Sequence, residues 1–586
     1  MNKIFACVYC FISLISCHSN GYDPYNFCFN ADNTEWYRTK GVVILMDSIS
    51  GKMYLTGESI DKIIIPPSGA IYQTIYLPEI RDEKIQITLK ARSSNVESSF
   101  LKVTGYDSKE NMLCTASSQL KDRGEFCDAE ITIPSHDVRF MKLIIEVSGI
   151  KDAKKREHAL YLDRMEVKAG GKNIETLSIP KLHATIAPQK VIVLDQNFSL
   201  DMDIEDKKII GIGETVHGSS TLEKCSFELM KDIVARHNGR LIIMEATTNF
   251  MLKWNLFITD HADFTYEELV ADMYGYSCSP DLLFEFLLWL KQYNQNRERK
   301  VRILGMDKVY SGFESSFIWA DYMYHFMEKN RHPLLDTLST LLIKSKYNQA
   351  KMTAQNSEIR QIMGEEEWMF FMQAIPKLAL ISEDLVSLFQ INCSAEDELR
   401  ERLMSTNVQE AISFGLNENE KVIVFAHLEH IGNHSFVGDY KEHSLGYHLN
   451  SQYGNKFYKI GLLTGTGTYT AINPTNGKMS SNDLELPAPN SLEEACMKTG
   501  HHFFFCSVDA ISEKILSTRF LGKVALKNQF QNYVSLENRM DALIFVKESQ
   551  SFDIPVLWLD SSIYEKKRME RLYQTMERNR VLQKNK

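Results

Sequence analysis

The chain has 586 residues, of which 44% are hydrophobic and 24% charged, and its formal net charge is −10 at pH 7. This length exceeds what one ordinary hydrophobic core accommodates, so two or three domains are expected, and the composition is that of a folded globular protein. The acidic balance excludes the basic footprint that nucleic-acid-binding proteins need, which predicts no nucleic-acid partner.

The first residues have the pattern of an export signal. Lys3 supplies a positive start, residues 4–16 are apolar, and the segment ends Leu14-Ile15-Ser16-Cys17. This apolar run is too short to span a bilayer as a mature helix. Its end resembles the lipobox of bacterial lipoproteins, in which the cysteine is lipidated. We therefore expect a lipoprotein signal at residues 1–17 and a lipid anchor on Cys17 that holds an exported protein on the cell envelope, in the outer membrane or periplasm. The alternatives are an ordinary signal peptide or a buried apolar segment of a cytosolic protein.

Residues 22–175 have the pattern of an all-β domain. Short segments alternate apolar and polar residues and are separated by turn residues, as in residues 71–77, 84–91, 99–107, 129–134, 139–147 and 160–171. Regularly spaced short strands predict a β-sandwich of the jelly-roll kind. Residues 159–174 resemble the last strand of galactose-binding-like domains, which makes the sandwich either a carbohydrate-binding module or a spacer. We favour the spacer, because no aromatic platform stands out in the sequence. Cys114 and Cys127 are the most plausible local disulfide of an exported protein.

Residues 176–200 show no sustained pattern and are expected to be a linker. From residue 201 to 586 the pattern is that of an α/β domain with a mostly parallel sheet flanked by helices. Short apolar runs at 207–213, 240–246, 301–307, 421–427 and 457–465 predict buried strands, and helical periodicity at 221–237, 281–296 and 398–416 predicts helices. Residues 312–415 are nearly all helical in pattern, which predicts a large helical insertion.

Polar residues stand at the ends of these predicted strands. In open α/β sheets, ligands bind beyond the carboxyl ends of the strands. The residues expected at that edge are Glu214, His217, Glu245, Asp307, His427, His430 and His434. Because histidine titrates near neutral pH and carboxylates stabilise its charged form, this group has the composition of a general-base site.

The glycines near the first strand have a mechanical interpretation. Gly211 and Gly213 are expected to let the chain turn sharply after the strand, and Gly218 to leave room beside His217. The segment matches neither a dinucleotide-binding fingerprint nor a phosphate-binding loop, and the chain has no GxSxG serine-nucleophile motif. The sequence HLEH at 427–430 is not the HExxH of zinc proteases.

An ordered series of motifs resembles the erythromycin esterase family. Residues 213–218 (GETVHG) resemble its GE-x-THG signature, with Val216 where the family usually has threonine. Further matches follow in the family's order, at Glu245-Ala246, residues 288–294, 301–307, Arg400-Glu401 with Met404 and Asn407, Ala426-His427 with His430, residues 444–447, 461–470, 491–493 and Asp541-Ala542. The resemblance covers about residues 190–560.

The resemblance implies a hydrolase that cleaves an ester, in the best-known members the lactone of a macrolide antibiotic, by direct attack of an activated water. Carried onto this sequence, His217 is the general base and Glu214 orients it. Glu245, His427 and His430 line the same pocket, and the candidate substrate-binding residues are Lys224, Arg400, Asp307 and His434. Besides Val216, two further positions depart from the family pattern. Ser226 stands where the family commonly has an arginine, with Lys224 nearby, and Leu428 replaces an asparagine. If that arginine holds the substrate in the macrolide enzymes, this protein is expected to act on a different substrate.

Two alternatives stay open. The direct-attack hypothesis needs no cofactor. The first alternative is a metal-dependent hydrolase, in which a bound divalent metal generates the attacking hydroxide. Histidine and glutamate side chains ligate such metals, and the candidate ligands are Glu214, His217, Glu245, His427 and His430. A catalytically inactive, lipid-anchored glycan-binding protein is the second alternative. The expected partner is a small-molecule ester or lactone, or an acylated glycan.

Overall fold

The structure is a computed structural model. The residues it describes are 26–30, 36–38, 42–57, 59–60, 63–64, 66–77, 84–121, 124–152, 154–155, 158–174, 184–195, 198, 200, 204–270, 278–307, 319, 322–323, 325–326, 332–344, 346–372, 393–433, 443–473, 476–525, 529–559, 562–563, 566–567, 569–570, 573–574, 576–577 and 580. The predicted signal segment with Cys17, and His434, lie outside the described residues.

The chain divides into two compact units. The first comprises Met1–Asp107 and Met112–Pro180, and the second comprises Ser108–Asn111 and Lys181–Lys586. Among the described residues, no helix is long and apolar enough to cross a membrane.

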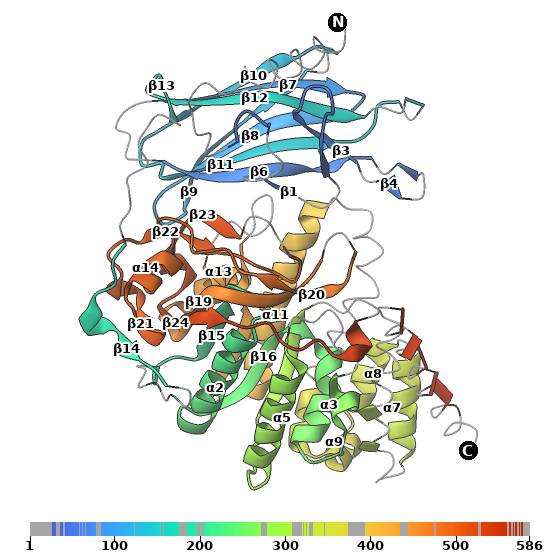
Figure 1. Ribbon diagram of the computed structural model, residues 1–586. Helices are drawn as coiled ribbons and strands as arrows, with labels where there is room; N and C mark the ends of the chain where they lie inside the picture. Colours follow the sequence, from blue (N-terminus) through green and yellow to red (C-terminus); the bar gives the residue numbers. More distant parts are fainter. Residues whose placement is uncertain are drawn as a thin grey trace, which may run out of the picture. The chain divides into compact units, whose positions relative to one another are not determined.

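The first unit consists of two antiparallel sheets, drawn as two layers in Figure 1. One sheet has the order β1 (Tyr37–Arg38), β6 (Ser68–Tyr76), β11 (Phe140–Ser148), β8 (Ser98–Tyr106) and β9 (Met112–Gln119). The other has the order β10 (Cys127–Pro134), β7 (Lys84–Ser94), β12 (Ala159–Ala169), β3 (Met53–Thr56) and β2 (Val43–Met46), with β13 (Lys172–Asn173) beside β12. A two-stranded sheet joins β4 (Ser59–Ile60) to β5 (Ile63–Ile64). Alternate residues of both large sheets, such as Leu89 and Leu143, pack into one core. The prediction of a strand-rich N-terminal region is confirmed.

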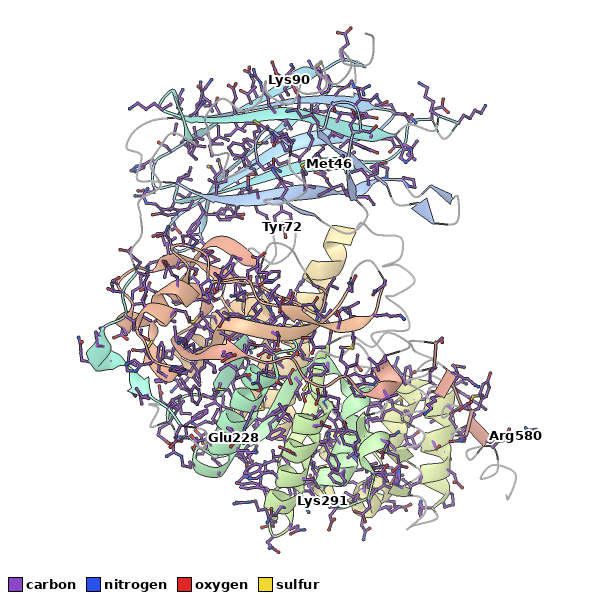
Figure 2. All side chains as sticks on the ribbon, viewed as in Figure 1. Met46, Tyr72, Lys90, Glu228, Lys291 and Arg580 are labelled. Atoms are coloured by element: carbon purple, nitrogen blue, oxygen red, sulfur yellow. The ribbon has the colours of Figure 1, made fainter. Side chains whose placement is uncertain are left out.

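One expectation for this unit, the local disulfide, was wrong. Cys114 and Cys127 are both free thiols, because Cys114 lies on β9 with its sulfur close to Gly105, whereas Cys127 begins β10 of the other sheet. The outer face of the second sheet also carries an aromatic pair, since Tyr54 and Tyr161 stack with ring centroids 5.3 Å apart and Arg92 lies 4.1 Å from the Tyr161 centroid. Lys90 stands on the same face (Figure 2). The sequence did not reveal this pair, because its members come from different strands.

The second unit is built on a nine-stranded sheet. Its order is β14 (Ile192–Val193), β21 (Phe503–Ser507), β24 (Ala542–Ser549), β19 (Phe457–Ile472), β15 (Ile209–Glu214), β18 (Lys421–His427), β16 (Gly239–Thr247) and β17 (Arg302–Asp307), with β20 (Met479–Asp483) paired to β19. The strands from β24 to β17 are parallel to one another, and β14, β20 and β21 pair antiparallel. A separate pair joins β22 (Ile515–Arg519) and β23 (Phe530–Ser535). The predicted mixed α/β class is confirmed.

Helices cover both faces of this sheet (Figure 1), and the buried hydrophobic residues described for this unit form three clusters. The described helices are α2 (Ser220–Arg236), α3 (Thr248–Ile258), α4 (Tyr266–Val270), α5 (Pro280–Asn294), α7 (Pro333–Ile343), α8 (Tyr347–Ala354), α9 (Ser357–Met363), α11 (Cys393–Gly415), α12 (Leu428–Ile431), α13 (Leu445–Tyr453), α14 (Leu492–Lys498) and α15 (Leu536–Arg539), with short 3-10 turns at Pro188–Lys190, Gly454–Lys456, Val508–Ala510 and Val556–Trp558. Helices α7, α8, α9 and α11 lie in the stretch expected to be a helical insertion.

The expected linker at 176–200 extends too far. Strand β14 pairs with β21, and Ile186 forms a bridge with Ile511, so residues 184–195 belong to the second unit. These residues lack a long apolar run because β14 is a two-residue edge strand and both of its residues are exposed.

Candidate active site

The order of the strands brings the predicted polar residues to one edge of the sheet. Strand β15 lies between β18 and β19, and Glu214 at its end is in register with His427 at the end of β18. Glu245 lies near the end of the next strand, β16, and Asp307 ends β17. The four consecutive strands β15, β18, β16 and β17 therefore place acidic and histidine side chains at the same edge of the sheet.

Gly211 and Gly213 were expected to let the chain turn sharply after the strand, but both lie within β15. A Cβ atom on Gly213 would lie 2.8 Å from the Cα of Leu428, and one on Gly211 would lie 2.7 Å from the Cγ2 of Ile431. The glycines thus let α12 lie directly against β15. This close approach brings His427 and His430 to the edge where β15 ends.

The turn that carries His217 is fixed on both sides. The backbone N–H of His217 donates to the carbonyl of Leu521 at 2.9 Å. Gly218 follows with φ of +74°, and a Cβ there would lie 2.0 Å from the carbonyl oxygen of Thr470, so only glycine fits. Helix α2 begins immediately afterwards, with the Ser219 hydroxyl accepting a hydrogen bond from the N–H of Leu222. The imidazole of His217 therefore stands on a rigid support.

His217 and Glu214 form a buried pair. The Nδ1 of His217 lies 2.7 Å from Oε1 of Glu214, and its Nε2 lies 3.8 Å from Oε2 of Glu245. Burial by itself would lower the pKa of His217, but the Glu214 hydrogen bond and the two carboxylate charges raise it above its usual value. The pKa of Glu214 is also raised, chiefly by burial. Because Glu214 engages Nδ1, Nε2 is the nitrogen that exchanges protons.

Arg400 from α11 connects the other acids. Its guanidinium contacts both carboxylate oxygens of Asp307, at 3.0 and 2.9 Å, and Oε1 of Glu245 at 2.9 Å. The other oxygen of Glu245 accepts the backbone N–H of His427 at 2.9 Å. Burial alone would raise the pKa of Glu245, but the charge and contact of His430, followed by the other cations around it, hold that pKa well below its usual value. Glu245 is therefore ionised at neutral pH.

His430 lies between two carboxylates. Its Nε2 is 3.2 Å from Oε1 of Glu245, and its Nδ1 is 2.5 Å from Oε1 of Glu401. Although burial opposes it, the charges of these two acids raise the pKa of His430 to about 10. Glu401 is held in turn by the backbone N–H of Leu445, which donates to its Oε2 at 2.7 Å. His430 is thus a fixed cation and not a base.

His427, unlike His430, is a neutral imidazole. Its Nδ1 accepts the backbone N–H of Glu429 at 3.3 Å, so the proton of the neutral ring is on Nε2. Burial, followed by the charge of His217, lowers the pKa of His427 to about 3. Its ring centroid lies 4.9 Å from that of His217 and 4.9 Å from that of Phe520. Among the described residues, Nε2 has no hydrogen-bond partner. His427 therefore offers a neutral, buried and unused N–H donor beside His217.

The raised pKa of His430 predicts a pH-dependent contribution to stability. Because the folded pKa of about 10 lies above the ordinary value of 6.5, this contribution is complete below pH 6.5 and is lost as the pH rises toward 10. We expect the free energy of unfolding of the wild type to fall across this range relative to that of a His430→Gln variant, as measured by urea denaturation at several pH values. A difference between the two proteins that stays constant from pH 6.5 to 10 would contradict the charged state of His430.

The structure brings together Glu214, His217, Glu245, Asp307, Arg400, His427 and His430. Lys224 is exposed on α2 and, within the described part of the chain, has no ion pair or hydrogen bond to this group. Ser226 is buried, and its hydroxyl donates to the carbonyl of Glu223 within the same helix. Sequence reasoning assigned no role to Glu401, although it was quoted in a matching motif, and it missed Phe520, which follows a strand outside the main sheet.

A metal site is not evident in this arrangement. Among the described residues, no group of three or more His, Cys, Asp or Glu side chains is placed to hold a metal ion. The guanidinium of Arg400 contacts Oε1 of Glu245, an oxygen that a bound cation would use, and His430 carries a positive charge beside it. The donor set therefore does not fit a divalent ion as it stands.

Comparison with known proteins gives one family. Residues 240–549 match the family model described as Erythromycin esterase, a match that begins after His217. Three similar solved structures are a Bacillus cereus protein (16% identity, 63% of this chain and 97% of that one, TM-score 0.49), a succinoglycan biosynthesis protein (18%, 62% and 96%, 0.47) and a His-to-Asn variant of an erythromycin esterase in its open conformation (15%, 60% and 93%, 0.39). No curated protein sequence matches the chain.

Proposed function

Since this chain belongs to the erythromycin esterase family, we propose that it hydrolyses a carboxylic ester or lactone with a water molecule activated by His217. The observation that carries this proposal is the buried contact between His217 and Glu214, with the unused N–H of His427 beside it. The pair supplies a base, and the neighbouring donor is suited to a carbonyl oxygen.

The proposed reaction begins at the Nε2 of His217. Nε2 takes a proton from water while the water oxygen attacks the carbonyl carbon, and the imidazolium then donates that proton to the departing alkoxide. Glu214 on Nδ1 and Glu245 near Nε2 favour the imidazolium that forms between these steps. A positioned general base of this kind typically contributes about 10² to 10⁴ in rate.

Negative charge develops on the carbonyl oxygen during the attack. The Nε2–H of His427 is a suitable donor to that oxygen, because the ring is neutral and held in place by the N–H of Glu429. One preorganised donor of this kind typically contributes about 3 to 4 kcal/mol to stabilisation of the transition state. Arg400 and His430 hold Glu245 ionised and do not need to touch the substrate for this role.

The first test is hydrolysis of chromogenic short-chain esters by the purified protein, before and after dialysis against a strong chelator. We expect the rate to survive dialysis, because a histidine base needs no metal-bound hydroxide. A rate that vanishes after dialysis and returns with zinc or manganese would replace this mechanism with the metallohydrolase alternative.

We also propose that the protein acts on the cell envelope through a lipid on Cys17. Support comes from the apolar run at residues 4–16 and the Leu14-Ile15-Ser16-Cys17 ending. In a bacterial host, radioactive palmitate is expected to label the wild type, and a Cys17→Ala variant should lose the label. Equal labelling of both proteins, or labelling of neither, would contradict lipidation of Cys17.

A further inference from the structure

Phe520 lies beside the candidate active site but comes from outside the main sheet. It directly follows β22, which pairs with β23. Its ring centroid is 4.9 Å from that of His427, and the two ring planes meet at 88°, so the edge of one ring meets the face of the other. Aromatic pairs prefer such edge-to-face arrangements, so this contact restricts how the His427 ring can turn. The reaction proposed above does not use Phe520.

The backbone around Phe520 is held on two sides. The N–H of Phe520 donates to the carbonyl of Gln529 at 2.9 Å. The next residue, Leu521, donates its N–H to the carbonyl of Thr215 at 3.0 Å, and its own carbonyl accepts the N–H of His217 at 2.9 Å. The segment that carries the Phe520 ring is therefore hydrogen-bonded to the same turn that carries His217.

The residue before Phe520 strengthens this anchor. Arg519 is the last residue of β22 and is 1% exposed. Its guanidinium donates to the carbonyls of Gly465 and Glu485, both at 2.8 Å, and to the side-chain oxygen of Gln529 at 2.6 Å. Moving a buried guanidinium away from its acceptors leaves a charge unpaired, which is costly. The end of β22 is therefore a fixed support for the aromatic ring that follows it.

His427 needs such a neighbour, because within the described part of the chain its ring has a hydrogen bond at one nitrogen only. Its Nδ1 accepts the N–H of Glu429 at 3.3 Å, which is long for such a bond, and its Nε2 has no hydrogen-bond partner there. The ring of His217 also lies beside it, at 4.9 Å and 68°. In the proposed reaction His217 gains a positive charge, whereas the apolar ring of Phe520 makes the same contact before and after the proton moves.

We propose that Phe520 is a positioning residue for His427, whose imidazole it holds at the rotation that directs Nε2–H toward the carbonyl oxygen of the substrate. This inference rests on the proposed role of His427 as the donor to that oxygen. Such a donor is most effective when it is in place before the charge develops, because a ring that must first rotate loses part of this advantage. The Phe520 ring also has no strong acceptor for Nε2–H, so the donor stays available to the substrate.

The first experiment is the Phe520→Leu variant, which removes the ring and keeps an apolar side chain. We expect kcat for ester hydrolysis to fall about tenfold with KM within about twofold of the wild type, because a misplaced donor weakens binding of the transition state and not of the substrate. In a His427→Gln background, the same substitution is expected to change kcat less than about twofold, since Phe520 acts through His427. An equal loss of kcat in both backgrounds would overturn the proposal, and so would an unchanged kcat in Phe520→Leu.

The second experiment needs no substrate. It is ¹⁵N NMR of the full chain labelled at histidine, with the His427 signals assigned from their absence in His427→Gln. In the wild type we expect Nε2 to carry the proton and Nδ1 to carry none. In Phe520→Leu the ring is free to turn, so the two tautomers are expected to mix and the shifts of the two nitrogens to move toward each other. Shifts of His427 identical in Phe520→Leu and the wild type would contradict the proposal.

Phe227→Leu is the matched control. Phe227 is 2% exposed, and its ring stacks on that of Phe286 at 4.7 Å, between α2 and α5. This variant also loses a buried aromatic contact, but we expect its kcat and its His427 shifts to be those of the wild type. Changes in the control equal to those in Phe520→Leu would assign the effect to a general loss of packing and overturn the proposal.

A second variant covers the case in which Phe520→Leu does not fold. Phe520→Met places a flexible, unbranched side chain at this position, and such side chains fill irregular gaps well. Because it also lacks the ring, it is expected to lower kcat and to mix the tautomers of His427 in the same way. Wild-type kcat and shifts in Phe520→Met would overturn the proposal.

The two readouts separate this inference from the proposed function. A protein that cleaves no ester but shows the expected shifts would disprove the hydrolase and leave Phe520 as the residue that orients His427. A protein that cleaves esters through His217, with neither the shifts nor the loss of kcat in Phe520→Leu, would keep the hydrolase and lose the positioning role.

Discussion

Replacement of His217 by alanine is expected to reduce kcat for ester hydrolysis about a thousandfold and to leave KM close to that of the wild type. The loss falls on kcat because the imidazole takes a proton only as the water attacks, and it makes no specific contact with the leaving group in the bound substrate. Both kcat and KM are measured by steady-state kinetics with an ester that the wild type cleaves, at a pH above the pKa of His217.

His237→Gln is the matched control for this experiment. His237 is also buried, caps the C-terminal end of the same helix, and pairs with Glu205 at 3.1 Å, so its removal perturbs the fold without touching the base. Full activity in the His217→Ala variant would show that the base is elsewhere. If the wild type binds a glycan but cleaves nothing, and His217→Ala binds it equally, the inactive glycan-binding alternative is the better account.

Replacement of Arg400 by alanine is expected to destabilise the second unit by about 3 to 5 kcal/mol and to lower kcat as well. The guanidinium contacts both Asp307 and Glu245, and its removal takes away the cation that these two buried carboxylates share, leaving His430 beside Glu245. Arg400→Lys is expected to restore little, because one ammonium group does not reproduce a planar fork with several fixed N–H donors. Chemical denaturation and steady-state kinetics measure the two effects.

Arg299→Ala is the corresponding control. Arg299 also makes a two-pronged contact with one acid, Glu420, but its side chain is 39% exposed, and exposed pairs contribute little. We expect this variant to lose less than about 1 kcal/mol and no activity. An Arg400→Ala protein as stable and active as the Arg299→Ala control would show that the network around Glu245 is not needed.

The strands of the second unit and the edge they form could be predicted from the sequence. The run at 421–427 coincides with β18, and the runs at 240–246 and 301–307 lie on β16 and β17. The runs at 301–307 and 421–427 are buried along their whole length and end at Asp307 and His427, and the mostly buried run at 240–246 has Glu245 next to its end, so the position and direction of these strands are visible in the pattern. Parallel strands then bring Glu214, Asp307 and His427 to one edge without further information.

The contacts and pKa shifts within the candidate site could not be predicted from the sequence, because they depend on segments that are far apart in the chain. Asp307 and Arg400 were expected to bind substrate, yet they contact each other across 93 residues of chain. The opposite pKa shifts of His427 and His430 arise from different neighbours, although the two residues are three positions apart on one turn. The close approach of Leu428 to Gly213 is equally invisible in either segment alone.

In the proposed function, His217 activates the water that hydrolyses an ester or lactone. The most direct measurement is a screen of the purified protein against macrolides and acylated sugars, with the product acid quantified by mass spectrometry and the His217→Ala variant as the blank. Because Ser226 is buried and bonded within α2 where the family commonly has arginine, we expect cleavage among substrates other than macrolides. We expect at least one substrate whose cleavage disappears in the blank. Cleavage of no ester, or equal cleavage by both proteins, would contradict it.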